Sequence, residues 1–198
     1  MSRNREPGGG LLPRMCWRQF FLLSAFNVEG MQHIGVAFTL LPALRRAARS
    51  EAEVDAGVRR QLSPFNCHPY LASPLLGAVA ALESEERGEE SERLKTIAAG
   101  PLAAIGDQFF WVCLKPVVAL IAVSLLVLGQ AWAAAAAFVV LYSIPQVILR
   151  LYLFRLGWLR GREAVIRVAG ANLPRWYSRI AIVGGAAAGL TAIGAGLQ

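Results

Sequence analysis

The longest apolar stretch of the chain runs from Pro116 to Leu149 and contains no charged residue. At about 1.5 Å per residue, a single helix over this stretch would be about 50 Å long, whereas the hydrocarbon core of a bilayer is about 30 Å thick. Gly129 and Gln130 divide the stretch into two apolar halves. The pattern therefore predicts a transmembrane helical hairpin over about residues 113–149.

A basic segment and a second apolar stretch follow the hairpin. The segment from Arg150 to Arg179 carries seven arginines and one glutamate, and such a loop is typical of the cytoplasmic side of a membrane. Residues of about 180–197 are free of charge and rich in Gly and Ala, which predicts a C-terminal span. Gly185 and Gly189 have the GxxxG spacing that lets helices approach closely in lipid; the alternative is a poorly packed terminus.

The amino-terminal half has shorter apolar runs that isolated polar residues interrupt. Glu29 and Gln32 are three residues apart and share one face of a predicted helix, on which polar atoms could bind a ligand. The alternative is an exposed Glu–Gln pair on a surface helix. The apolar residues that recur at helical spacing around this pair are Phe26, Ile34, Phe38 and Leu41.

Two prolines bracket the next polar residues. Pro64 and Pro69 restrict the backbone around Asn66 and His68, so this segment is expected to be rigid and extended or turned. An amide and an imidazole on such a backbone can donate to and accept from a hydroxyl group of a ligand. Because no nucleophile or acid partner lies nearby in the sequence, ligand binding or structural capping is favoured over catalysis.

A third apolar segment contains the pairs Gly100–Pro101 and Gly106–Asp107, which predict breaks or turns. A broken segment whose backbone lines a cavity is a recurrent way to build a solute site in a membrane, with a carboxylate such as that of Asp107 as acceptor. The alternative is that Asp107 caps the following helix. The acidic run over residues 83–92 is interpreted as a solvated loop.

The composition places these elements in a membrane. Hydrophobic residues make up 56% of the chain, and the mean hydropathy of +0.46 is too high for an ordinary soluble domain. The net charge of +7 fits either nucleic acid or a membrane surface, and the hydropathy favours the membrane, with no nucleic-acid partner. The spacing of Cys16, Cys67 and Cys113 indicates neither a metal site nor a disulfide framework.

The predicted fold is therefore an all-α integral membrane protein. It has amphipathic and broken or re-entrant helices in the N-terminal half, then the transmembrane hairpin and the Gly/Ala-rich C-terminal span. Residues 1–16 are interpreted as a flexible cytoplasmic tail, because no apolar core typical of a signal peptide follows the early arginines.

Three segments together resemble a known family. They are Asn27–Gln32, Phe65–Tyr70, and Gly100–Asp107 with Phe110 and Trp111. In the same order and with similar spacing, over about residues 17–165, they resemble the enzyme IID component of the mannose/fructose/sorbose-type bacterial sugar phosphotransferase systems.

The resemblance implies a multi-pass subunit of the bacterial inner membrane, with residues 17–198 as a single enzyme IID-like domain. Its partners would be the membrane subunit enzyme IIC, the soluble subunits IIA and IIB, a hexose and membrane lipid, in a higher-order oligomer of IIC–IID pairs. The chain would be a transport subunit and not an enzyme, with no catalytic residue, metal or cofactor, because phosphoryl transfer takes place on partner subunits.

The resemblance also assigns roles to residues. Those expected to bind the sugar are Asn27, Glu29, Gln32, Asn66, His68 and Asp107. Those expected to shape the broken segment are Gly100, Pro101, Gly106 and Trp111.

The chain departs from the family pattern at two points. Gly30 stands where the family usually has Arg, so a charge next to Glu29 is missing. The chain is also short at its C-terminal side, which raises the alternative of a non-transporting membrane scaffold or regulator of phosphotransferase signalling. The intact polar motifs favour transport.

Overall fold

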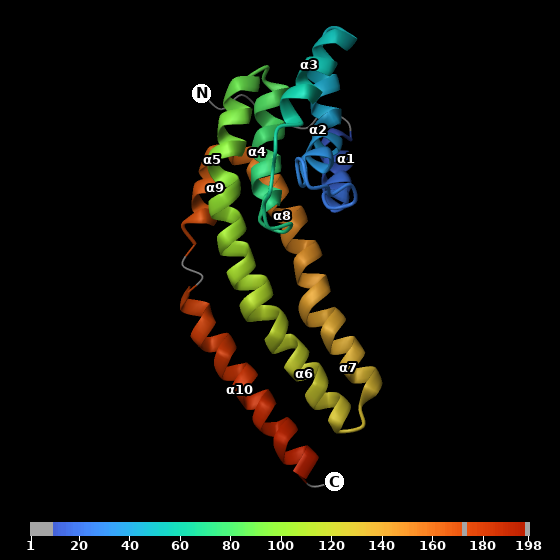
Figure 1. The fold of residues 1–198 in the computed structure, drawn as a ribbon, viewed down its shortest axis with the longest axis vertical. Helices are drawn as coiled ribbons and strands as arrows, with labels where there is room; N and C mark the ends of the chain where they lie inside the picture. The colour runs from blue at the N-terminus through green and yellow to red at the C-terminus, as the bar shows by residue number, and fades with distance from the viewer. Residues whose placement is uncertain (1–9, 172–173, 197–198) are drawn as a thin grey trace. The chain divides into compact units, whose positions relative to one another are not determined.

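A computed structural model describes residues 10–171 and 174–196. The described residues form helices and connecting loops, and no strand occurs among them (Figure 1). The described residues form two compact units: one holds those up to Ala104 together with Arg150–Gly170, and the other holds Ile105–Leu149 with the described residues from Ala171 on. The sequence-based division at residues 16 and 17 stays a prediction.

The first unit is built around a central buried helix. Every residue from Leu71 to Ala81 is buried, because the other helices of the unit surround this segment. Gly77 lies in this segment and Gly157 in the helix that packs against it, and both allow the two backbones to approach closely. A Cβ on Gly77 would lie 2.1 Å from the carbonyl oxygen of Phe154. The helices of this unit are α1 (Leu11–Arg18), α2 (His33–Ala47), α3 (Glu51–Gln61), α4 (Ala72–Ser84), most of α5 (Gly88–Gly106), the later part of α8 (Ile144–Arg160) and α9 (Arg162–Ala169).

The structure differs from two predictions in this unit. Residues from Leu11 form α1, with Met15 fully buried, so the later part of the predicted tail 1–16 is a helix; residues 1–9 lie outside the described residues. The basic segment that begins at Arg150 was predicted to be a loop, but most of it is helical, because it includes the later part of α8 and all of α9. Arginine is a good helix former, so its high content there did not require a loop.

The second unit contains the predicted helical hairpin. Helices α6 (Lys115–Val127) and α7 (Ala131–Phe138) are joined by a tight turn at Gly129, whose φ is 75°. The N–H of Gln130 donates to the carbonyl of Leu125 at 2.9 Å, as in helices that end on a left-handed glycine. The hairpin turn is thus confirmed where the sequence placed it. A π-helical segment (Val139–Ser143) then leads into the start of α8.

The predicted break in the third apolar segment is wrong. Helix α5 continues through Gly100 and Pro101, and Gly106 has helical dihedral angles of −66° and −47°. A π-helical segment (Asp107–Leu114) follows directly and leads into α6. A proline removes a single backbone bond, and apolar helices tolerate this where a local π adjustment absorbs the misfit.

Helix α10 (Pro174–Gly196) packs against α6, but not through the predicted GxxxG pair. A Cβ on Gly185 or Gly189 would meet nothing within 4 Å. The contact uses the neighbouring face instead: a Cβ on Gly184 would meet Val117 at 2.8 Å, and the hydroxyl of Ser124 donates to the carbonyl of Ala187 at 2.8 Å. Gly185 and Gly189 are exposed and do not take part in the contact with α6, so a close helix approach at this pair stays a prediction.

Two helical stretches are long and apolar enough to cross a membrane. They are Gly88–Val127 and Ala131–Arg160, with mean hydropathies of 2.4 and 1.8 in their most apolar windows. Only 22% and 17% of these windows are buried within the protein, so their side chains are left for lipid or for another subunit. The all-α membrane fold predicted from the sequence is confirmed, while the third span at residues 180–197 stays a prediction.

Candidate functional site

The predicted helix that would carry Glu29 and Gln32 on one face is wrong, because α2 begins only at His33 and both residues precede it. The loop that precedes α2 is shaped by Asn27. Its Oδ1 accepts hydrogen bonds from the backbone N–H groups of Glu29 and Gly30, at 3.1 and 3.0 Å. The backbones of Asn27 and Met31 are also bonded to each other in both directions, at 3.2 and 2.9 Å. Asn27 therefore holds a tight Asx-type turn, at whose exposed side Glu29 lies.

Gln32 joins this loop to the second motif. Its Nε2 donates to the carbonyl of Cys67 at 2.7 Å, and its Oε1 accepts from the N–H of Cys67 at 3.1 Å. The side-chain amide thus pairs with both polar groups of one buried residue, as a neighbouring strand would. Backbone bonds from Gln32 to the carbonyl of Phe65 and from Phe65 to the carbonyl of Gly30 extend this pairing. We call this set of bonds the Gln32 clasp.

His68 is buried beside the clasp, with 1% of its surface exposed. Its Nδ1 accepts from the N–H of Tyr70 at 3.3 Å, and the two rings meet edge to face with centroids 4.7 Å apart. Burial first, and the positive charge of Arg150 second, lower the pKa of His68 to about 4. The imidazole is therefore neutral at physiological pH and keeps its Nδ1 lone pair for the N–H of Tyr70.

Asn66 has a different environment, because it is exposed. Its Oδ1 lies 3.5 Å from Nε2 of Gln32, so the clasp orients the amide at the surface. Of the five predicted binding residues in this unit, Glu29 and Asn66 are exposed, Asn27 is half-buried, and Gln32 and His68 are buried. Asn27, Gln32 and His68 form the framework that positions the two exposed residues.

Asp107 lies in the second unit, as the first residue of the π-helical segment, and is half-buried. Because the helix runs through Gly106 without a break, no free helix N-terminus exists there, and the capping role considered for Asp107 is wrong. In the same stretch Gly100 and Pro101 are exposed and Gly106 is buried, while Trp111 is partly exposed. These four residues lie on a continuous helical path and do not shape a broken segment.

Gly30 has little room for the side chain that the family pattern expects. A Cβ built on it would lie 2.1 Å from Nδ1 of His33. The N–H of Gly30 is used by Asn27, and its carbonyl accepts from the N–H of Phe65 at 3.2 Å. Where the family usually has Arg, this chain thus has a glycine against which the imidazole of His33 packs closely.

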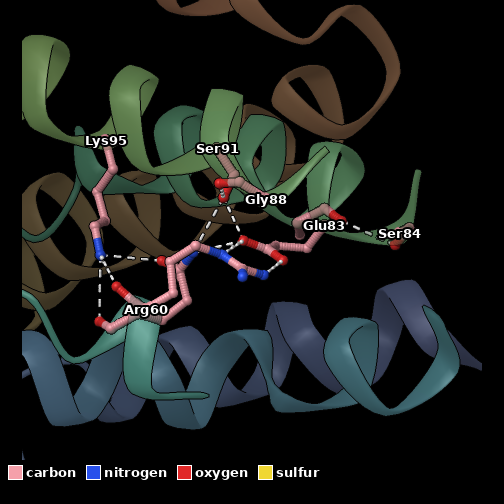
Figure 2. Close-up of polar contacts among 8 residues, drawn as sticks. Arg60, Glu83, Ser84, Gly88, Ser91 and Lys95 are labelled. Carbon is pink, nitrogen blue, oxygen red and sulfur yellow. Dashed lines mark hydrogen bonds and ion pairs between the residues drawn. The ribbon is translucent and has the colours of Figure 1, made fainter. Parts of the chain in front are cut away.

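A buried polar network connects α3, α4 and α5 (Figure 2). The carboxylate of Glu83, with 3% of the residue exposed, accepts from Arg60 at 2.6 and 3.2 Å, from Gln61 at 2.6 Å and from the hydroxyl of Ser91. Lys95, 1% exposed, donates to Oε1 of Gln61 at 3.1 Å and to its backbone carbonyl at 3.3 Å. The pairing with Glu83 raises the pKa of Arg60.

The interpretation of residues 83–92 as a solvated loop is therefore wrong at its start and near its end. Glu83 closes α4 and Ser91 belongs to α5, and both are buried in the network. A signal was available in the sequence, because Ser91 and Lys95 are four residues apart and lie on one helical face. A buried charge requires such partners, and the acidic residues considered by themselves do not reveal them.

The fold and the motif define an α-helical membrane protein whose polar loops are held together by one buried glutamine. A sequence model described as the PTS system mannose/fructose/sorbose family IID component matches residues 11–194. The chain belongs to this family of sugar phosphotransferase IID components.

Relatives with curated names agree with this assignment. The fructose permease IID component of Bacillus subtilis (strain 168) is 30% identical over 173 residues, covering 84% of this chain and 62% of the relative. The mannose-specific EIID component of Escherichia coli (strain K12) is 31% identical over 169 residues, covering 81% of this chain and 59% of the relative. The chain thus spans about three fifths of the length of these relatives.

Solved structures show a similar fold. A chain in the cryo-EM structure of the mannose transporter ManYZ with microcin E492 matches with a TM-score of 0.69 and 26% identity, covering 97% of this chain and 70% of that chain. A second structure, described as that of a membrane protein, matches with a TM-score of 0.77 and 26% identity, covering 92% and 68%.

Proposed function

We propose that this chain is a membrane subunit of a phosphoenolpyruvate-dependent sugar phosphotransferase system. With enzyme IIC it forms the translocation path for a hexose, which enzyme IIB, recharged by IIA, phosphorylates as the sugar enters the cell. The chain itself carries no phosphoryl group. It works in the bacterial inner membrane as a multi-pass protein, in an oligomer of IIC–IID pairs.

The observation that supports this proposal best is the Gln32 clasp. It joins two of the three motifs that the resemblance rests on, and each of these motifs has one exposed polar residue, Glu29 in the first and Asn66 in the second. Two large apolar side chains close to Glu29 in the sequence are also exposed: Phe26 at 56% and Val28 at 95%. Contiguous apolar residues at a surface are typical of a contact with another protein or with lipid, which fits a path shared with enzyme IIC.

The chemistry of these groups suits a neutral sugar. The carboxylates of Glu29 and Asp107 accept hydrogen bonds from hydroxyl groups, and the amide of Asn66 both donates and accepts. None of the three acts as a nucleophile in this role. Neutral His68 and Gln32 serve as positioning residues, because their polar atoms bond to the backbone around Asn66.

The test is co-expression of the chain with its cognate IIC and IIB subunits and measurement of labelled hexose uptake and phosphorylation. Asn66→Ala and Asp107→Ala are expected to abolish uptake while the membrane complex still copurifies. Gln108→Ala is the matched control, because Gln108 is an exposed neighbour of Asp107, and it should transport normally.

Two results would overturn the proposal. Normal uptake after deletion of this gene, with IIC intact, would show that the chain is a scaffold or regulator instead of a translocator. Full uptake by both alanine variants would show that these side chains do not contact the sugar.

A further inference from the structure

Arg150 is a buried cation in a helical stretch that is able to cross a membrane. It is 8% exposed and belongs to the apolar stretch Ala131–Arg160. It is also the first charged residue after the charge-free run that ends at Leu149. An ionisable residue in such a stretch is costly to keep, and in transport proteins it commonly marks the path of a substrate. The contacts of Arg150 therefore bear on its role.

Arg150 and Gln19 form a reciprocal pair within the first unit. Nη2 of Arg150 donates to the backbone carbonyl of Gln19, and Nε2 of Gln19 donates to the backbone carbonyl of Arg150 at 3.4 Å. The guanidinium group also lies over the ring of Phe20, with its Cζ 4.3 Å from the ring centre. These contacts join α8 to the short 3₁₀ helix Gln19–Phe21 and hold both side chains in place.

Each side chain of this pair keeps one polar atom without a hydrogen bond. Nε of Arg150 is a donor and Oε1 of Gln19 is an acceptor; both are shielded from solvent and have no hydrogen-bond partner within the described part of the chain. Unsatisfied buried polar groups are rare and each needs a physical explanation. A hydroxyl group can accept a hydrogen bond from such a donor and donate one to such an acceptor, so the two atoms suit a ligand that carries hydroxyl groups.

The pair lies close to the second of the three polar motifs. Arg150 is near enough to His68 for its positive charge to contribute to the lowered pKa of that imidazole. His68 follows Asn66 by two residues, and the Gln32 clasp holds Cys67 between them. The unsatisfied atoms therefore belong to residues packed near the segment for which we propose sugar binding.

We propose that Arg150 and Gln19 bind a hydroxyl group of the transported hexose, with Nε of Arg150 donating to the hydroxyl oxygen and Oε1 of Gln19 accepting from the hydroxyl hydrogen. The inference rests on the proposed function and adds two residues to its sugar site. A transport path opens alternately to the two sides of the membrane. The pair, which is buried in this structure, therefore meets the sugar in a conformation of the complex in which the path is open.

The first test is Gln19→Met in the full chain, co-expressed with its IIC and IIB subunits. Methionine nearly keeps the volume of the side chain but removes Oε1. The KM for uptake of labelled hexose should rise by about twofold to tenfold, the equivalent of one neutral hydrogen bond. The melting temperature of the purified chain should not fall, because the variant removes a buried acceptor that lacks a partner. A purely structural role predicts the opposite pair of results.

The second test is Arg150→Lys, which keeps the positive charge and a donor for the carbonyl of Gln19 but has no Nε–H group. The KM for uptake should rise by about tenfold to a hundredfold, as expected for a hydrogen bond from a charged group. Arg155→Lys is the matched control, because Arg155 is an exposed arginine of the same helix. Its KM should equal that of the wild type.

The outcomes separate this inference from the proposed function. Wild-type KM values in both Gln19→Met and Arg150→Lys, while Asn66→Ala abolishes uptake, would overturn the inference and leave the proposed function standing. A lower melting temperature of Gln19→Met with an unchanged KM would also overturn it, since the unsatisfied atoms would then bond an internal water. Normal uptake after deletion of the gene would refute the proposed function itself, and the inference with it.

Discussion

Replacing Gln32 by leucine is the most direct test of how the two motifs are held together. The substitution keeps the volume of a buried side chain but leaves the N–H and the carbonyl of Cys67 without the bonds of 3.1 and 2.7 Å that Gln32 provides. An orphaned buried polar group costs about 1–3 kcal/mol. For two such groups on neighbouring backbone, we expect local destabilisation of about 2–5 kcal/mol.

The assay is hydrogen–deuterium exchange of the full chain in detergent, followed on peptides that contain Cys67. Since about 1.4 kcal/mol corresponds to a factor of ten, exchange there should accelerate by about 30-fold to about 5000-fold. Thr39→Val is the control on the same helix: the Thr39 hydroxyl bonds to the carbonyl of Gly35, which also belongs to the helix ladder. This variant should change exchange at Cys67 by less than about twofold.

The refuting result is equal exchange at Cys67 in Gln32→Leu and in the wild type. It would show that the backbone pairing of Phe65 suffices without the side chain. A second readout is uptake in the co-expression assay. It should fall in Gln32→Leu although Glu29 and Asn66 are unchanged, because the clasp positions both.

Two further predictions concern pH and packing. The native state keeps His68 neutral with a pKa of about 4, whereas the unfolded chain takes up a proton near pH 6.5. The first unit should therefore lose stability as the pH falls from about 6.5 to about 4. Thermal unfolding at a series of pH values measures this loss, which should be absent in His68→Asn. Gly77→Ala places a Cβ 2.1 Å from the carbonyl oxygen of Phe154 and should lower the free energy of unfolding by about 2 kcal/mol or more. Gly100→Ala meets open space in another α-helix and should raise it by about 0.5–1 kcal/mol. Equal melting temperatures of the two variants would contradict the packing described for α4.

The hairpin and the clasped motifs were accessible from sequence for different reasons. The charge-free run with Gly129 in its middle has few solutions in a bilayer, so its turn could be placed to the residue. Asn27, Gln32 and His68 interrupt apolar runs, and such interruptions are costly unless the polar groups are bonded. The sequence indicated that these polar groups need hydrogen-bond partners, but it did not show that the partners are backbone groups of the protein itself.

The helix through Pro101 and the network around Glu83 were not accessible in the same way. Proline and glycine are local signals, whereas α5 continues through both of them and leads directly into a π-helical segment. Glu83 looks like any member of an acidic run until α3 and α5 are placed beside α4. Tertiary contacts of this kind decide whether a charge is solvated or buried, and they cannot be inferred from the local sequence pattern.

The close packing of Gly77 against the backbone at Phe154 has a consequence for synthesis. At about 5–20 residues per second, the ribosome completes Phe154 roughly 4–15 s after Gly77. During this interval the most apolar helix of the first unit, α4, has one face without its eventual cover, although the partners of Glu83 in α3 and at the start of α5 already exist. Because α3, α4 and the start of α5 are synthesised before α8, the polar network around Glu83 can assemble first. The face of α4 that contains Gly77 stays uncovered until α8 has been synthesised.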